Sequence, residues 1–153
     1  MENHTSQVEN RQLNSRRPDR PEWLATLAIG NAGEVAVANL LKSIGIAVRK
    51  SRDFSTDLEF VAGKIEVKND VKALSSGYAA IETGYRGRPS GVNTSCATTW
   101  VYVVGSEIIL VALSALRRGV ADLPERRGGE NATIKLLPLD TLRRIGISVR
   151  GGR

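Results

Sequence analysis

Apolar residues near the start of the chain recur at steps of three and four, which is the period of an amphipathic helix. The stripe begins after Pro21 and comprises Trp23, Leu24, Leu27, Ala28, Val37, Leu40, Leu41 and Ile44. Gly45 follows the last of them and predicts the end of the helix there. Because Gly30 and Gly33 lie inside the stripe, the pattern predicts either two helices or one helix with a bend.

Short β-branched and apolar segments follow the helix, and their length and composition predict strands. They lie at 46–48, 58–61, 65–67, 78–81, 100–104 and 108–112, with a further candidate at 134–137. A short helix capped by Ser114 is expected at 114–118, a polar loop at 124–131 and a last helical turn or two at 139–145. One helix, then mostly strands, then mixed elements indicate an α/β (α+β) fold.

The length of 153 residues suits one domain with its own core, which we place at 21–150. Residues 1–20 contain few apolar side chains and several arginines, a composition typical of a disordered basic arm. No segment resembles a secretory signal or approaches the roughly 18 apolar residues that a membrane span needs. We therefore expect no membrane association.

The charge balance favours an anionic partner. Lys and Arg number 22 against 16 Asp and Glu, giving a net charge of +6. Most of these cations are arginines, whose planar fork suits phosphate, so the composition favours nucleic acid and in particular DNA. The single cysteine, Cys96, cannot form an intramolecular disulfide, and this predicts a cytoplasmic location.

Candidate chemistry is concentrated in the two strands expected on either side of a Gly63-Lys64 turn. Asp57 begins the first strand, and the turn would bring it close to Glu66 and Lys68 on the second. Strand alternation places Glu66 and Lys68 on one face and their apolar neighbours on the other. The polar pair should therefore face a cleft beside Asp57.

These residue types fit metal-assisted hydrolysis of a phosphodiester. Mg²⁺ takes a few carboxylate oxygens and keeps water and phosphate oxygens as its other ligands, and Mn²⁺ is expected to substitute for it. Asp57 and Glu66 would supply the carboxylates, and the backbone carbonyl of Val67 would complete the protein's share. Lys68 would orient the attacking water or neutralise charge on the phosphate.

Asp57, the triplet Glu66-Val67-Lys68 and the preceding Gly33-Glu34 resemble the PD-(D/E)XK nuclease superfamily over residues 33–102. Segments 66–70, 81–82 and 89–91 with Trp100 are similar to small phage-type nucleases, including Holliday-junction resolvases. The resemblance implies a restriction-endonuclease-like αβββαβ core with a mixed central sheet flanked by helices. It also implies Asp57 and Glu66 as metal ligands, Lys68 as catalytic lysine, and Glu34 as a carboxylate reaching the same metal.

The same resemblance suggests branched DNA as substrate and a role in DNA recombination. If the chain is phage-encoded, its location would be the host cytoplasm. Symmetric cutting of a junction would require a homodimer, which the sequence itself does not show.

The match departs from the family pattern at one position, since Thr56 stands where the family name has proline. A second triplet, Asp70-Val71-Lys72, also fits the motif. We favour Glu66-Val67-Lys68 because it lies within an apolar strand directly after the turn, whereas Asp70 opens a more polar segment.

Other candidates have both a functional and a structural interpretation. Glu34 lies among small and apolar neighbours, where a charge needs a partner or a metal. Glu82 closes an apolar strand and is either a carboxylate beside the metal, a ligand of a second metal, or a surface charge.

A glycine-rich basic loop follows, and we expect it to contact DNA rather than to be only a solvated turn. Its candidate DNA-binding residues are Arg86, Arg88, Ser90, Asn93, Thr94 and Ser95.

The sequence thus predicts a magnesium-dependent DNA endonuclease. Two alternatives remain: a non-catalytic nucleic-acid-binding protein with a nuclease-like fold, and an enzyme of the same fold that acts on RNA.

Overall fold

The structure is a computed structural model that describes residues 21–52, 56–61 and 63–150, with side chains from Ile29 onward. The arm predicted at 1–20 and the side chain of Trp23 lie outside this description. In chain order the elements are α1 (Pro21–Ser43), β1 (Val48–Lys50), β2 (Leu58–Phe60), β3 (Gly63–Asn69), α2 (Ala73–Ser76), β4 (Tyr78–Tyr85), β5 (Arg88–Pro89), η1 (Gly91–Asn93), β6 (Thr99–Val104), β7 (Glu107–Ala112), α3 (Leu113–Val120), β8 (Glu125–Arg127), η2 (Gly129–Asn131), β9 (Ala132–Pro138), α4 (Leu139–Ile145) and β10 (Ile147–Arg150).

Helix α1 is continuous through both glycines and ends before Gly45, whose φ of 81° allows the chain to reverse. Val37 and Leu41, one turn apart, are buried against the large sheet. Gly33 lets the helix approach β3 closely, because a Cβ there would lie 2.8 Å from the Cβ of Asn69. The apolar stripe therefore sets which face of α1 meets the sheet.

The large sheet has six strands in the order β1-β2-β3-β6-β7-β10. Strands β3 and β6 are parallel and the other neighbours are antiparallel, so the sheet is mixed. The expected α+β class with a mixed central sheet and flanking helices is confirmed. The β3–β6 crossover is built mainly from strands β4 and β5, with only the four-residue helix α2.

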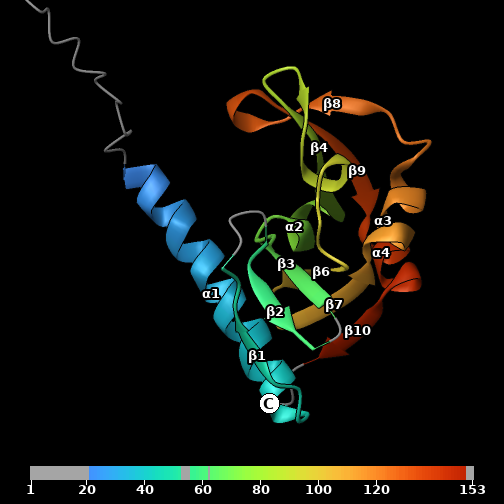
Figure 1. Ribbon diagram of the computed structural model, residues 1–153. Coiled ribbons are helices and arrows are strands. Elements are labelled where there is room, and N and C mark those ends of the chain that lie inside the picture. The colour runs from blue at the N-terminus through green and yellow to red at the C-terminus, as the bar shows by residue number, and fades with distance from the viewer. Residues whose placement is uncertain (1–20, 53–55, 62, 151–153) are drawn as a thin grey trace, which may run out of the picture.

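A second, antiparallel sheet in the order β5-β4-β9-β8 extends beyond the large one (Figure 1). It corrects the loop predicted at 124–131, since 125–127 pair with β9 as a strand. The predicted cap of the short helix is also wrong: Ala112, not Ser114, is its N-cap, and no side chain caps it.

Two apolar cores lie on opposite faces of the large sheet. One packs α1 against alternate residues of β3 and β6, including Ile65, Val67 and Val101. The other packs the opposite residues of β6, including Trp100 and Tyr102, against α3, α4 and the small sheet. Strand alternation explains the division, because neighbouring side chains point to opposite faces.

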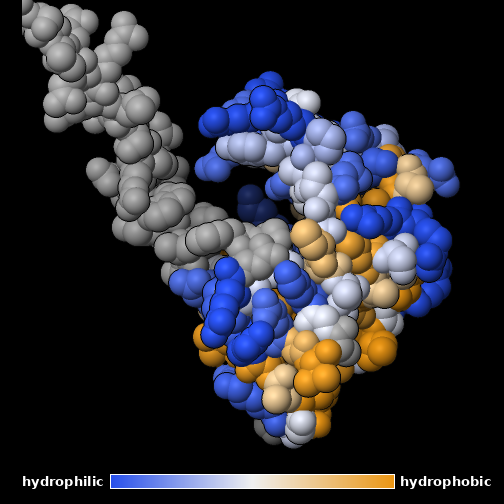
Figure 2. All heavy atoms as spheres, in the orientation of Figure 1, coloured by the Kyte–Doolittle hydropathy of each residue, from blue (hydrophilic) through white to orange (hydrophobic). Residues whose placement is uncertain are grey.

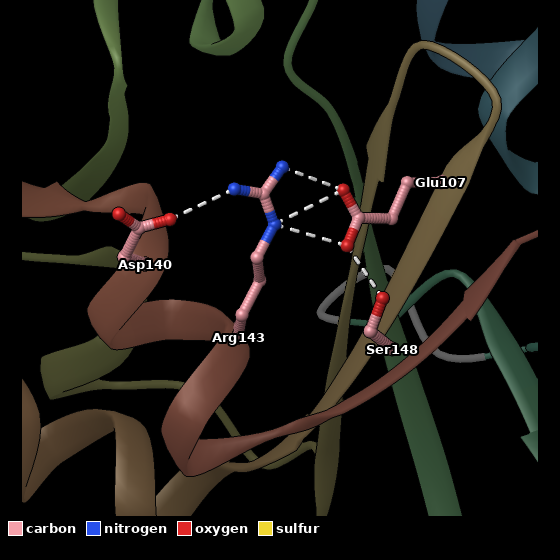
Figure 3. A network of polar contacts seen from close by, with 4 residues as sticks. All are labelled: Glu107, Asp140, Arg143 and Ser148. Atoms are coloured by element: carbon pink, nitrogen blue, oxygen red, sulfur yellow. Dashed lines mark hydrogen bonds and ion pairs between the residues drawn. The ribbon is translucent and has the colours of Figure 1, made fainter.

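A polar network ties the C-terminal elements to the large sheet (Figure 3). Glu107, at the start of β7, accepts hydrogen bonds from Arg143 of α4 and from Ser148 of β10, and Arg143 also donates to Asp140. The Arg143 Nη2 to Glu107 Oε2 distance is 2.8 Å. The hydrogen bonds from Arg143, and then from Ser148, hold the pKa of the Glu107 carboxyl below its ordinary value despite burial. This carboxylate is fully engaged in holding the fold.

Within the described residues, no helix has the length and apolar character needed to cross a bilayer.

Candidate active site

Asp57 lies at the entrance to β2 and is held against β3. Its backbone N–H donates to the Ile65 carbonyl at 3.0 Å, and its Oδ2 accepts from the Val67 N–H at 2.6 Å. The hairpin turns before Gly63, not at Gly63-Lys64, since Phe60 already pairs with Gly63. This register places the Asp57 carboxylate against the middle of the triplet.

Glu66 and Lys68 lie side by side on the face of β3 away from α1. Lys68 Nζ is 2.7 Å from Glu66 Oε1 and 5.2 Å from the ring centroid of Trp100. The Glu66 side chain is 17% exposed and that of Lys68 39%. The pair is thus partly sunk into the protein with one edge open to solvent.

The electrostatics of Glu66 reveal a local excess of negative charge. Burial raises the pKa of its carboxyl above the ordinary value; Lys68 opposes this, and repulsion from Asp57 and Glu82 adds to the increase. Two carboxylates from other segments, Asp57 before β2 and Glu82 on β4, therefore act on the Glu66 carboxylate of β3, and Lys68 is the ammonium paired with it. An added cation would relieve that repulsion.

Tyr102 adds a buried polar group to this environment. It pairs in register with Lys68 across the parallel β3–β6 ladder, and its hydroxyl has no hydrogen-bond partner within the described part of the chain. Burial, followed by the charges of Asp70 and Glu66, raises the pKa of the phenol well above its ordinary value. A buried hydroxyl without a partner is costly, and a water or ion beside it is one way in which the cost is relieved.

Glu82 links this cluster to the glycine-rich loop. Its Oε1 accepts a hydrogen bond from Ser90 Oγ at 2.6 Å. Gly91, with φ of 56°, sits against the Glu82 backbone so closely that a Cβ would lie 2.2 Å from the Glu82 carbonyl oxygen. The loop therefore positions Glu82 beside the cluster.

Several of the loop's predicted DNA-binding side chains have partners inside the protein. Asn93 Nδ2 donates to the Thr83 carbonyl at 2.8 Å. Ser95 Oγ accepts from the Trp100 indole N–H at 3.1 Å and from the Ala97 N–H at 3.2 Å. These contacts give Asn93 and Ser95 a structural part in the loop.

Three other residues predicted to bind DNA, Arg86, Arg88 and Thr94, are exposed. Their side chains remain accessible to a partner.

Glu34 lies on α1, which packs on the face of the large sheet opposite to Glu66. Its carboxylate pairs with Lys50 of β1, and its side chain is 19% exposed. The structure thus shows a helix carboxylate with a strand lysine for a partner, whereas Glu66 faces away from α1.

The second triplet has a structural explanation. Asp70 Oδ1 accepts from the Lys72 N–H at 3.2 Å, and Oδ2 accepts from the Ala80 N–H at 3.1 Å. Asp70 therefore fastens the α2 turn to β4, while Lys72 is exposed. Glu66 and Lys68 are the pair that lies with Asp57.

The donor set at Asp57 and Glu66 fits a hard cation. Mg²⁺ in phosphoryl-transfer sites is usually held by one or two carboxylates, with water and substrate phosphate as further ligands. The carboxylates of Asp57 and Glu66 and the backbone carbonyl of Val67 meet that requirement in type. Over the ranges described, no three Asp, Glu, His or Cys side chains form a preassembled metal cage.

Two contributors were missed as site residues from the sequence. Trp100 was not predicted as a site residue; it is buried, and its ring lies under Lys68. Tyr102 gave no signal, because its proximity to Lys68 depends on a parallel pairing that no local pattern encodes. Strand alternation in 100–104 could have shown only that the two rings share a face.

No protein-family model and no curated protein sequence matches this chain. Among solved structures, the chain is similar to a bacterial homing endonuclease, I-Ssp6803I, with 16% identity and a TM-score of 0.44. The likeness covers 84% of this chain and 79% of the other.

Proposed function

We propose that this protein is a magnesium-dependent DNA endonuclease of the PD-(D/E)XK type, with Asp57 and Glu66 as metal ligands and Lys68 as catalytic residue. The observation that carries the proposal is the half-buried Glu66, paired with Lys68 and repelled by Asp57 and Glu82. Repulsion between neighbouring carboxylates opposes folding, and carboxylates perturbed in this way are typical of functional sites. A divalent cation bound beside a polyanionic substrate would neutralise this excess of negative charge.

The residues divide the chemistry among them. A bound Mg²⁺ would polarise the phosphodiester and lower the pKa of a bound water. Asp57 and Glu66 would hold it, and the Val67 N–H keeps Asp57 oriented. Lys68, held over Trp100, would hydrogen-bond the attacking water or neutralise charge developing on the phosphate.

Glu82 has a positioning part in this scheme. Ser90 and the close packing of Gly91 fix its carboxylate near Glu66. From there it would increase the negative potential that draws the cation, or contribute to a second one. Glu34 belongs to the proposal only through the family resemblance.

The proposal is tested by incubating the full chain with labelled single-stranded, duplex, flap and four-way DNA in Mg²⁺, Mn²⁺ or EDTA. Cleavage that needs the metal and stops in EDTA supports it. Asp57→Asn and Lys68→Ala should each reduce the cleavage rate by about 10²–10³-fold. Lys72→Ala is the matched control from the neighbouring triplet and should cut like the wild type.

Absence of metal-dependent cleavage on every substrate, with DNA binding intact, would leave the non-catalytic alternative. A preference for cutting RNA would replace the DNA assignment. Cleavage of the four-way substrate by symmetric nicks would support both the junction preference and a homodimer, which remain the finer, resemblance-based part of the proposal.

A further inference from the structure

The far end of the small sheet contains a groove lined with arginines. The β4–β5 hairpin and the β8–β9 hairpin meet there, joined by a hydrogen bond of 3.0 Å from the Arg86 N–H to the Asn131 carbonyl. The groove encloses about 600 Å³, and Arg86, Arg126 and Arg127 line it. We call this surface the arginine groove, after these three residues. They come from segments far apart in sequence, brought together by the β4–β9–β8 pairing.

The charges of the arginine groove are not used by the fold. All three side chains are exposed, and within the described residues no carboxylate forms an ion pair with any of them. Arg86 lies over the Tyr85 ring at 5.2 Å, a contact that orients its guanidinium without neutralising it. Figure 2 shows strongly hydrophilic residues gathered over this end of the molecule, at the top of the view.

Arginines elsewhere in the protein behave differently. Arg49 pairs with Glu59, Arg143 pairs with Glu107 and Asp140, and Arg117 donates to backbone carbonyls. Those arginines are committed to internal partners. Arg118 and Arg144 are also exposed without an ion pair to any described residue, but they lie singly on α3 and α4, whereas Arg86, Arg126 and Arg127 line one concave surface between two hairpins.

The groove also contains an acid, Glu125, so its potential is not uniform. Glu125 Oε1 accepts a hydrogen bond from Thr83 Oγ1 at 3.2 Å, which holds the carboxylate toward β4. Three arginines against this one glutamate give this end of the small sheet a net positive charge, with Arg127 on the same face of β8 as Glu125 and Arg126 on the opposite face. A polyanion with regularly spaced charges fits it better than a single small anion would.

The position of the groove relative to Glu66 points to one polyanion. Within strand β4 (Tyr78–Tyr85), Glu82 lies beside the candidate site, and Arg86 directly follows the end of the strand. Four residues of extended chain span about 13 Å, which corresponds to roughly four phosphates along one strand of a duplex. A DNA strand with its scissile phosphate at Glu66 could therefore reach the groove a few nucleotides away.

We propose that Arg86, Arg126 and Arg127 bind the phosphate backbone of duplex DNA flanking the cleavage point. Strand β8 and the β4–β5 hairpin would then form a DNA-binding surface. The inference rests on the proposed nuclease function for its choice of DNA as occupant. It assigns binding to Arg126 and Arg127, which lie in a segment expected to be only a polar loop. Contacts of this kind add affinity and fix register but do not select sequence.

Binding is measured separately from cleavage by fluorescence anisotropy of the full chain with labelled duplex DNA in EDTA. Arg126→Ala/Arg127→Ala should weaken binding by about tenfold and lower the slope of log affinity against log salt by about 1.8, because each lost phosphate contact removes about 0.9. Arg118→Ala/Arg144→Ala removes the same charge from α3 and α4 and should bind nearly like the wild type. Equal weakening by both double variants, or none by the first, would overturn the proposal.

A charge-conserving variant and a stability measurement distinguish the loss of phosphate contacts from a loss of structure. Arg126→Lys/Arg127→Lys should retain most of the salt slope, since charge rather than shape dominates phosphate contact, and loss of the slope in this variant would contradict the mechanism. Thermal unfolding should be unchanged in all three double variants, because the substituted side chains are exposed.

The two proposals fail in distinguishable ways. If the wild type binds duplex DNA through the groove but never cuts, the nuclease assignment fails and the DNA-binding role of the arginine groove is retained. If the wild type cuts DNA and the Arg126→Ala/Arg127→Ala protein binds and cuts DNA equally well, only the DNA-binding role of the arginine groove is overturned. Tighter binding of duplex RNA than of duplex DNA would overturn the choice of occupant.

Discussion

Glu66 and Glu107 are both carboxylates on strands of the large sheet, and both are paired with a cation, yet their environments have opposite effects. The Glu107 side chain is 7% exposed, and Arg143 and Ser148 together hold its pKa below the ordinary value. Glu66 is 17% exposed with Lys68 at 2.7 Å, but burial and two neighbouring acids raise its pKa. The first carboxylate is satisfied by its neighbours and the second is not.

The difference shows how a structural ion pair is distinguished from a candidate catalytic one. Around Glu107 a planar guanidinium and a hydroxyl supply the hydrogen bonds that an ionised carboxylate needs. Around Glu66 a single ammonium faces a surplus of negative charge, and the Tyr102 hydroxyl nearby has no partner in the described part of the chain. We therefore expect an added cation to stabilise the second environment and not the first.

The largest expected effect is on activity at the unsatisfied carboxylate. Glu66→Gln should reduce cleavage by about 10³-fold, because a ligand of the proposed metal is lost. Its free energy of unfolding in metal-free buffer should stay within about 1 kcal/mol of the wild type, since a neutral amide relieves repulsion in a partly buried site. Chemical denaturation and a cleavage assay on the same preparation check both. A large loss of stability would show that Glu66 holds the fold as Glu107 does.

The converse effect is expected at the satisfied carboxylate. Glu107→Gln should lower the free energy of unfolding by about 2 kcal/mol, because hydrogen bonds to a charged group are weakened and the Arg143 guanidinium keeps no counter-charge on β7. The cleavage rate of the folded variant should remain near that of the wild type. Strong loss of cleavage in a variant shown to be folded would contradict a purely structural role.

Acid should erase the advantage that Glu107 supplies. Its folded-state pKa lies below the ordinary 4.5, so its stabilisation is fully present above that value and is lost as pH falls through the lower folded-state pKa. The stability difference between wild type and Glu107→Gln should therefore be constant near neutral pH and shrink toward zero in acid. Urea unfolding of both proteins from pH 7 down to about pH 3 measures it. A difference that grows on acidification would reverse the assigned sign.

The smallest effect is expected at the hydroxyl that completes the network. Ser148→Ala removes one hydrogen bond to Glu107 and should cost about 1 kcal/mol, less than Glu107→Gln. Combined with Glu107→Gln it should add less than it costs alone, because the contact that Ser148→Ala removes is already weakened when its acceptor is a neutral amide. Additive losses in this double-mutant cycle would mean that Ser148 stabilises β10 by another route.

Patterns along the chain predict the elements whose contacts are local. Helix α1 follows its apolar stripe and ends before Gly45, and β2 and β3 form the expected hairpin beside Asp57. Strands β8 and β10 were not anticipated, since the three residues of β8 are all exposed and Ile147 at the start of β10 is 71% exposed. Such segments become strands through pairing with β9 and β7, which no local periodicity reveals.

The sequence by itself determined that Glu66 and Lys68 share a face of one strand and that a short hairpin brings Asp57 to it, because strand alternation and turn length act over a few residues. Only the tertiary structure decided what surrounds them. Parallel pairing of β3 with β6 places Trp100 and Tyr102 beside Lys68, and the β3–β6 crossover brings Glu82 within range of Glu66. These contacts join distant segments, so they depend on how whole sheets pack and on the loop entropy lost in closing them.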